Sequence, residues 1–401
     1  MATFTLSRFS TPERLKSIRE DHLLALLGRH GDYFKQRGVE LATFNGSGID
    51  YDGIVKVLMS PDTSTPKPLS DDLYFVHEMA TPSYMDELLE ELRGLPQDER
   101  AVFTLGSDVT PADVAVQVRL LAPDLIERKH AEHFLTSKRS FEYFQSKKDL
   151  QRKFKAPSAA KLSALDGALA DRFEEMKRGR SAKVFIFHRD DGIWFLVRHG
   201  DTYKREGAIE AGTSSSVYYR PEIYDVIKYD EGLGDLCVNA NGNKKICALY
   251  REKLGLHFFG DAQRFAERAK YTLEPLREDG EDALVCSDID GIDAIRLKEI
   301  QFFWGGSENE VEIRKASDIF AVLKRKQRGL PAKVALSSAK FDVKFTDSKT
   351  PRTVAIRPSN VASYTRDADA GAVEQWLQRR GFARQVAEGS HARADAPVAR
   401  P

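Results

Sequence analysis

The sequence predicts an α+β protein, with a helical N-terminal region followed by a β-rich domain of mainly antiparallel sheet and a few helices. Three observations lead to this fold class. Apolar residues before about residue 180 recur with the helical period, and from Lys183 the period changes towards 2. Short turns separate many of the later strand candidates, which favours antiparallel pairing because parallel strands need long crossovers. We expect a helical domain over 1–180, an antiparallel-sheet α+β domain over 181–385 and a disordered tail over 386–401.

The helical region carries clear start signals. A threonine that can cap a helix stands directly before a proline that suits the first helical turn at Thr11-Pro12, Thr81-Pro82 and Thr110-Pro111. Asp113 is placed to complete a capping box with Thr110. The helical pattern resumes from Asp124 towards Phe154 and again from Pro157 to Met176, and Gly179 ends it.

The β-rich region begins with a hairpin signal. An Asp-Gly turn at Arg189–Gly192 separates two alternating apolar runs, which predicts a two-stranded hairpin. The expected strands are 183–188, 193–198, 216–220, 223–229, 235–239, 283–287, 293–303, 310–314, 340–346 and 352–357. The expected helices between and after them are 243–255, 261–269, 317–328 and 371–380.

Composition indicates a cytoplasmic protein with no membrane segment. Hydrophobic residues make up 41% and charged residues 30% of the 401 residues, which suits a globular protein of two or three domains. No apolar run approaches the roughly 20 residues that span a bilayer, and the N-terminus lacks the apolar core of a signal peptide. Cys237, Cys247 and Cys286 are odd in number and have no Cys-x-x-Cys spacing, so we expect buried thiols in a reducing compartment.

The charge is unevenly distributed although the net charge is zero. Residues 1–127 hold 21 Asp/Glu against 12 Lys/Arg, and residues 128–183 hold 15 Lys/Arg against 7 Asp/Glu. Concentrated cations can neutralise phosphates, and interleaved aromatic residues can stack on bases or face a core. The candidate nucleic-acid-binding residues on this basic helical surface are Arg128, Lys129, Lys138, Arg139, Lys147, Lys148, Arg152 and Lys153.

One short motif resembles a catalytic signature. Arg198-His199-Gly200-Asp201-Thr202 follows an apolar strand and resembles the opening of the histidine phosphatase superfamily. The resemblance implies that His199 attacks a phosphoryl group while Arg198 holds the phosphate oxygens. It further implies a second phosphate-binding histidine, for which His257 is the structured candidate. The competing interpretation makes this segment the second strand of the predicted hairpin.

A second enzymatic possibility is a metal-dependent nuclease. Asp342-Val-Lys344 has the short spacing of a carboxylate and lysine that act with Mg²⁺, and Asp293 or Asp318 could supply the upstream carboxylate. The alternative is a strand with charges on an exposed face. Glu127 and His130 form only half of a di-iron pattern, so we predict no metal and no cofactor, apart from Mg²⁺ if the nuclease interpretation holds.

These observations favour a binding protein. Phosphate-loop, dinucleotide-binding and nucleophile-elbow motifs are absent from the sequence, which argues against the common nucleotide-dependent and hydrolase classes. We predict a cytoplasmic component of a larger protein complex that binds DNA or RNA, with a protein partner or a second copy, in bacterial antiviral defence or a mobile element. The alternative is a phosphoester hydrolase, either the nuclease or the histidine phosphatase-like enzyme that uses His199.

Overall fold

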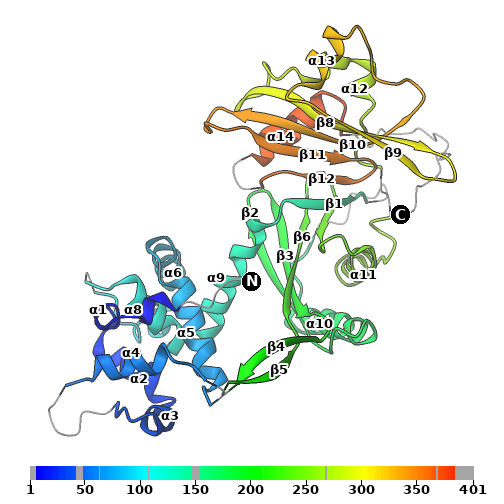
Figure 1. Ribbon diagram of the computed structural model, residues 1–401. Coiled ribbons are helices and arrows are strands. Elements are labelled where there is room, and N and C mark those ends of the chain that lie inside the picture. The colour runs from blue at the N-terminus through cyan, green and yellow to red at the C-terminus, as the bar shows by residue number, and fades with distance from the viewer. Residues whose placement is uncertain are drawn as a thin grey trace. The chain divides into compact units, whose positions relative to one another are not determined.

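The computed structural model describes residues 6–41, 48–62, 64–106, 108–146, 154–210, 212–266, 269–366 and 369–383. The chain divides into two compact units, Met1–His133 and Phe134–Pro401 (Figure 1). They are called unit 1 and unit 2 below. The predicted domain boundary near residue 180 therefore lies inside unit 2. The predicted tail at 386–401 lies outside the described residues.

Unit 1 consists of helices around the buried helix α8. The helices begin and end at α1 (Pro12–Leu15), α2 (Glu20–Gly28), α3 (Gly31–Gln36), α4 (Tyr51–Leu58), α5 (Lys67–Met79), α6 (Pro82–Gly94), α7 (Gln97–Arg100), α8 (Pro111–Leu121) and α9 (Pro123–Ser137), which continues into unit 2. Every residue of α8 from Ala112 to Val118 is buried. A helix that is covered on all sides is expected to be apolar around its circumference, which explains why Val114, Val116 and Val118 all lie in the core. The three predicted Thr-Pro starts are confirmed, since the side chains of Thr11, Thr81 and Thr110 each accept a backbone N–H from their helix.

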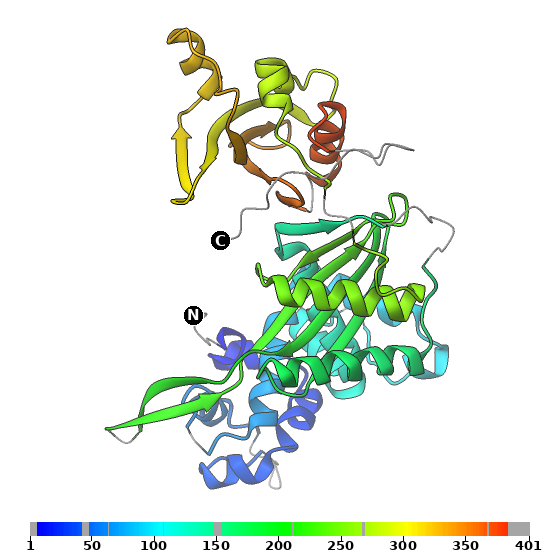
Figure 2. The same ribbon diagram turned by 90° about the vertical axis from the view of Figure 1, so that its right-hand side faces the viewer.

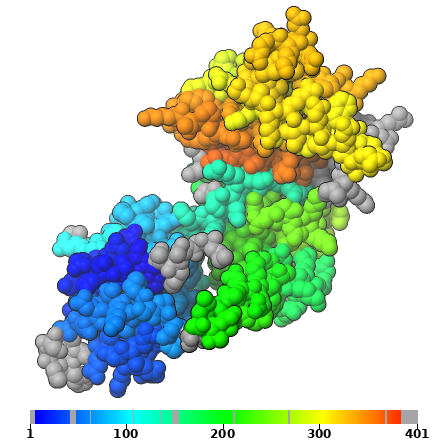
Figure 3. All heavy atoms as spheres, viewed as in Figure 1, coloured from blue at the N-terminus to red at the C-terminus, as the bar shows by residue number. Residues whose placement is uncertain are grey.

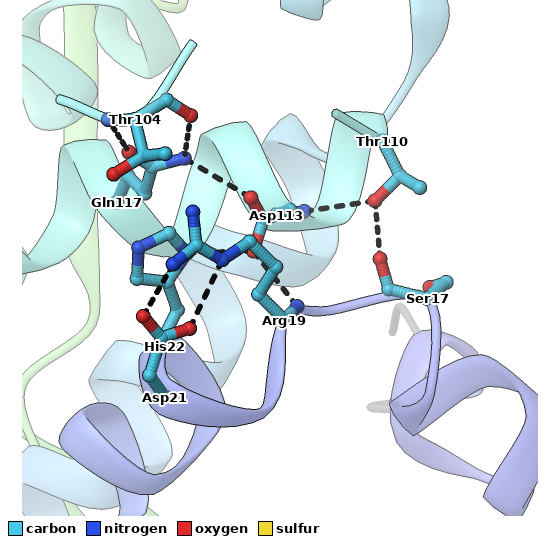
Figure 4. A network of polar contacts seen from close by, with 8 residues as sticks. All are labelled: Ser17, Arg19, Asp21, His22, Thr104, Thr110, Asp113 and Gln117. Carbon is cyan, nitrogen blue, oxygen red and sulfur yellow. Dashed lines mark hydrogen bonds and ion pairs between the residues drawn. The ribbon is translucent and has the colours of Figure 1, made fainter. Parts of the chain in front are cut away.

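A buried polar network ties α8 to the start of α2 (Figure 4). The Thr110 hydroxyl accepts the Asp113 N–H at 3.1 Å, which is half of the predicted capping box. Asp113 is only 1% exposed. Its carboxylate accepts the backbone N–H of Arg19 at 2.9 Å and contacts Nδ1 of His22 at 2.8 Å. Its other oxygen accepts the Gln117 amide at 3.0 Å. The carboxylate is thus fully used in holding two helices together.

Unit 2 is built on a ten-stranded sheet in which all the neighbouring strands are antiparallel, so the predicted α+β class is confirmed. The order is β2-β3-β6-β7-β1-β12-β11-β10-β8-β9, and within the part of the chain that the structure describes β4 and β5 pair only with each other. The strands are β1 (Ser140–Phe144), β2 (Ala182–Arg189), β3 (Gly192–Gly200), β4 (Lys204–Glu210), β5 (Thr213–Tyr219), β6 (Glu222–Tyr229), β7 (Leu236–Asn239), β8 (Ile292–Gly305), β9 (Glu310–Lys315), β10 (Ala335–Phe345), β11 (Arg352–Arg357) and β12 (Val361–Ser363). The helices are α10 (Ala159–Glu175), α11 (Lys244–Leu254), α12 (Pro275–Glu278), α13 (Ile319–Arg325) and α14 (Ala370–Arg379).

Strand β1 joins the two halves of this sheet. Its residue Glu142 lies opposite Val238 of β7 on one side and Val361 of β12 on the other. The predicted helix from Asp124 towards Phe154 is therefore wrong after Ser137. Phe141, Tyr143 and Phe144 are buried. Packing these aromatic side chains in the sheet stabilises the fold more than continuing α9 would.

Helices α10 and α11 cover one face of the first half of the sheet. Figure 2 shows the two helices side by side across these strands. Leu169 and Phe173 of α10 share a core with Val197 of β3 and Ile227 of β6. The predicted hairpin is confirmed as β2–β3, with Arg189 opposite Gly192 at its turn. This packing explains why the sequence alternates after Lys183.

Other predicted elements differ from the structure. The expected strand at 283–287 is not formed: residues 283 and 284 end the short 3₁₀ helix Gly280–Leu284, and 285–287 lie in the loop and turn after it. Residues 261–266 lie mostly in turns in place of the expected helix, whose residues 267 and 268 are not described. Strands β4 and β12 were not predicted, because they are polar or very short. Within the described residues, no helix combines the length and apolar character needed to cross a membrane.

Candidate nucleic-acid interface

The predicted basic surface does not form a single helix face. Arg128 is exposed on α9, whereas Lys129 pairs with Glu91 at 2.8 Å and with Glu132 at 3.0 Å. Partial burial lowers the pKa of Lys129, but its hydrogen bonds to both carboxylates outweigh burial and the pKa is raised. Lys129 is therefore occupied by unit 1's own acids.

The other predicted basic residues, from Lys138 to Lys153, lie either in a linker or outside the described residues. Lys138 and Arg139 connect α9 to β1, with Arg139 exposed. The remaining candidates, Lys147, Lys148, Arg152 and Lys153, lie outside the described residues. The aromatic residues of β1 face the core, as the core interpretation of this stretch predicts, so they are not free to stack on bases.

His199 lies in the core of unit 2. Its side chain is 0% exposed and stacks on Phe173 with ring centroids 4.1 Å apart. Nδ1 donates to the carbonyl oxygen of Gly200 at 2.8 Å, and Nε2 contacts Oδ2 of Asp225 at 3.0 Å. Tyr250 donates its hydroxyl to the same carboxylate oxygen at 2.7 Å. Burial and the Asp225 charge raise the pKa of Tyr250 well above its usual range, so the phenol keeps this proton.

The neighbouring Arg198 points to the other face of β3, because successive strand residues alternate. Its guanidinium lies 5.6 Å from the Phe185 ring centroid, and its Nε is 3.4 Å from Glu222. The two residues of the phosphatase-like motif therefore do not converge on one phosphate. His257 lies in the π-helical turn Gly255–Phe259, where burial and then Lys253 lower its pKa. Within the described residues, no hydrogen bond or ring contact joins His257 to His199.

The glycine of the motif has a packing role. A Cβ at Gly200 would lie 2.5 Å from the carbonyl oxygen of Arg178 and 2.6 Å from Cδ of Arg220. The turn before β2 crosses β3 at this point, and only glycine allows so close an approach. The Arg-His-Gly pattern is thus explained by a core histidine followed by a backbone crossing.

The candidate nuclease residues lie in separate ion pairs on β10. Asp342 is 3.0 Å from Lys298, and Lys344 is 3.3 Å from Asp293. Asp318 caps α13 by accepting the N–H of Ala321. In the part of the chain that the structure describes, no group of three or more His, Cys, Asp or Glu side chains could hold a metal ion. These residues therefore do not fit the Mg²⁺ that a nuclease would require.

A basic cavity of about 560 Å³ opens between α10, the turn before β2, the end of β3 and the start of β6. The residues that border it include four cationic and two acidic ones, and the acidic residues are Asp166 and Glu222. The four cationic residues are Arg180, Lys183, Arg198 and Arg220. His199 also borders this cavity, but only through its backbone, because its side chain is 0% exposed.

Two of these cations share an aromatic support. Lys183 lies opposite Arg198 in the β2–β3 register. The Lys183 Nζ is 5.1 Å from the Phe185 ring centroid, on the same ring that supports Arg198. The ring can position both cations, and Arg198 has the Glu222 carboxylate 3.4 Å from its Nε as a second partner. Arg180 contacts Asp171 at 2.9 Å, but both side chains are more than half exposed, so this pair is weak.

Arg220 is held rigidly at one side of the cavity. Its Nη1 donates to the carbonyl oxygens of Lys177 at 2.8 Å and Asp201 at 3.1 Å. Its guanidinium carbon lies 4.4 Å from the ring centroid of Tyr203. These contacts position the guanidinium through neutral groups, two carbonyl oxygens and an aromatic ring.

The two-stranded ribbon β4–β5 extends from the same place, between Tyr203 and Arg220. Figures 1 and 2 both show it projecting away from the ten-stranded sheet. Ile209 is 84% and Tyr218 65% exposed, and Arg205 lies opposite Tyr218. The ribbon thus presents a cation, an aromatic ring and an apolar tip to solvent, next to the basic cavity.

This surface was not predicted from the sequence, although its Lys and Arg residues are concentrated in one stretch. Residues 177–205 hold eight Lys/Arg against three Asp/Glu, so their cations are as concentrated as those of residues 128–183. The cations are spread over a turn, two strands and a ribbon, so no single periodicity groups them. No protein-family model and no curated protein matches this chain.

Proposed function

We propose that this protein binds nucleic acid through the basic cavity and the β4–β5 ribbon. The observation that carries the proposal is the cluster of Arg180, Lys183, Arg198 and Arg220 in one open cavity. Cations held at fixed positions attract the phosphate backbone and release its counterions.

The ribbon favours a polymer over a small phosphorylated molecule. A metabolite site is usually enclosed and largely apolar. Here the cations border an open hollow that continues into an exposed ribbon with Arg205, Tyr218 and Ile209. A two-stranded ribbon fits the major groove of duplex DNA, and exposed aromatic rings can also stack on unpaired bases.

The proposed surface differs from the predicted one, while the predicted class of ligand is retained. Lys138 and Arg139 precede β1, and both stay candidates for peripheral contacts. A role in genome defence stays a prediction. Neither hydrolase alternative is proposed, since His199 is enclosed and Asp342 and Lys344 face other charges.

The test is fluorescence anisotropy with labelled duplex DNA, single-stranded DNA and RNA between about 50 and 200 mM salt. We expect binding that weakens steeply with salt. The double variant Lys183→Gln/Arg198→Gln should weaken binding for all sequences and reduce the slope of log affinity against log salt by about 2 for a duplex, because each phosphate contact contributes about 0.9.

The matched control is Arg172→Gln/Lys245→Gln, which removes the same charge from exposed positions on α10 and α11 outside the cavity. A second variant, Ile209→Ser/Tyr218→Ser, should lower affinity without changing the salt slope. Equal effects of the cavity pair and the control, or no binding by the wild type, would refute the proposal. Probe cleavage that needs Mg²⁺ would instead support the nuclease alternative.

A further inference from the structure

Among the described residues, strand β9 forms one edge of the ten-stranded sheet and pairs with β8 on one side only. It lies on the outer surface of unit 2, in the yellow region of Figure 3. Val311 is 45% and Ile313 51% exposed, and both lie on one face of the strand because they are two residues apart. Trp304, 48% exposed, follows Phe303, the β8 residue that lies opposite Val311. An edge strand with exposed apolar residues is a template for pairing with another strand.

The charges of β9 are separated along its length. Glu310 and Glu312 occupy its first half, and Arg314 and Lys315 its second half. A parallel pair of such strands would place like charges together. An antiparallel pair places the acidic half of one strand against the basic half of the other, which stabilises the pair. The strand is therefore complementary to itself in the antiparallel direction.

We infer that β9 pairs with β9 of a second copy of this chain about a two-fold axis, extending the sheet across the dimer. With the axis at Ile313, this side chain meets its copy, and Glu312 of each strand lies opposite Arg314 of the other. A two-fold axis makes each contact occur twice, so two such cross-strand ion pairs form. Val311 and Ile313 of both copies then make one apolar cluster on the same face of the joined sheet.

Within one chain, Glu312 and Arg314 already contact each other at 2.7 Å, and both are more than a third exposed. The same two side chains can therefore serve the interface with little rearrangement. Arg314 also lies over the Phe302 ring, with its guanidinium carbon 4.9 Å from the centroid, which fixes its position at the edge.

The experiment is sedimentation velocity of the full chain at increasing concentration. The wild type should shift from monomer to dimer. Glu312→Arg should prevent this, and so should Arg314→Glu, because each places like charges across the axis twice. An equal mixture of the two variants should form dimers again, since one strand then carries two arginines at these positions and the facing strand carries two glutamates.

The double swap Glu312→Arg/Arg314→Glu should dimerise by itself at wild-type concentrations, and thermal melting of every variant checks that it is folded. A wild type that stays monomeric at its solubility limit would overturn the inference. So would single variants that dimerise as the wild type does, or a mixture of folded single variants that stays monomeric.

Discussion

At the scale of single residues, the buried His199–Asp225 pair shows how a catalytic-looking motif can have a structural role. Both ring nitrogens of His199 face acceptors, the Gly200 carbonyl and the Asp225 carboxylate. The Asp225 side chain is 2% exposed and accepts a second hydrogen bond from Tyr250. A buried carboxylate is costly unless it is hydrogen-bonded. The histidine is therefore needed to satisfy Asp225 inside the core.

The first prediction concerns the stability of this pair. His199→Ala should lower the free energy of unfolding by about 2–4 kcal/mol, because it leaves a cavity beside Phe173 and removes one partner of a buried carboxylate. Urea unfolding followed by circular dichroism measures the change. Tyr250→Phe, which keeps the ring and removes one hydrogen bond to the buried carboxylate, should cost about 1.5–3 kcal/mol. A His199→Ala protein as stable as the wild type would contradict the structural role.

At the scale of elements, charged side chains form a ladder across strands β8, β9 and β10. Glu299 of β8 contacts Lys315 of β9 and Lys340 of β10, each at 3.0 Å. The Glu299 side chain is 13% exposed, whereas those of Lys315 and Lys340 are 67% and 45% exposed. Asp342 of β10 forms a separate pair with Lys298 of β8. This arrangement accounts for the alternating Asp and Lys of β10 without a catalytic role.

The second prediction follows from the pKa of Glu299. Burial raises this pKa, but hydrogen bonds from Lys315 and Lys340 outweigh burial, so it lies below 4.5. A carboxyl group whose pKa falls on folding stabilises the protein above its unfolded pKa, and this contribution disappears as the pH falls through the folded pKa. Glu299→Gln should therefore be less stable than the wild type at neutral pH, and the difference should shrink below about pH 4.5.

Urea unfolding at a series of pH values measures this difference. Glu281→Gln removes the same charge from an exposed position in the 3₁₀ helix Gly280–Leu284 and serves as the control. Its difference from the wild type should stay small at every pH. A Glu299→Gln difference that is constant across the acid range would show that the two lysines do not stabilise the ionised carboxylate.

At the scale of the whole molecule, each unit has its own core. Unit 1 buries apolar residues from its helices around α8. In unit 2, β1 joins strands β2, β3, β6 and β7 to strands β8–β12. Helix α9 ends at Ser137, directly before β1 begins at Ser140. The chain can therefore be divided after α9 without removing a strand from the sheet, whereas a division at residue 180 separates β1 and α10 from it.

The third prediction tests this division. Fragments 1–137 and 138–401 should each unfold cooperatively, as measured by circular dichroism on heating. Fragment 181–401 should fail to do so, because it lacks β1 and the α10 residues that cover Val197 and Ile227. If 181–401 is as cooperative as 138–401, the boundary near residue 180 that the sequence suggests is the better one.

The sequence alone determined the elements whose signals are local. Thr11, Thr81 and Thr110 cap the helices that they were expected to start, and the Asp-Gly turn closes the β2–β3 hairpin. Helix caps and tight turns depend on residues three or four positions apart, so they can be predicted from the local sequence. The change of period at Lys183 likewise predicted the antiparallel sheet.

Only the tertiary structure decided the features whose partners are distant in the chain. Ser140–Phe144 becomes a strand because β7 and β12, roughly 100 and 220 residues later, lie on either side of it. A short apolar run is compatible with either helix or strand until such partners are known. In the same way, Glu91 forms an ion pair with Lys129, and Asp225 contacts the buried ring of His199. The cationic residues that border the cavity come from several elements. Residue types show which charges exist, but burial and pairing decide which of them can reach a ligand.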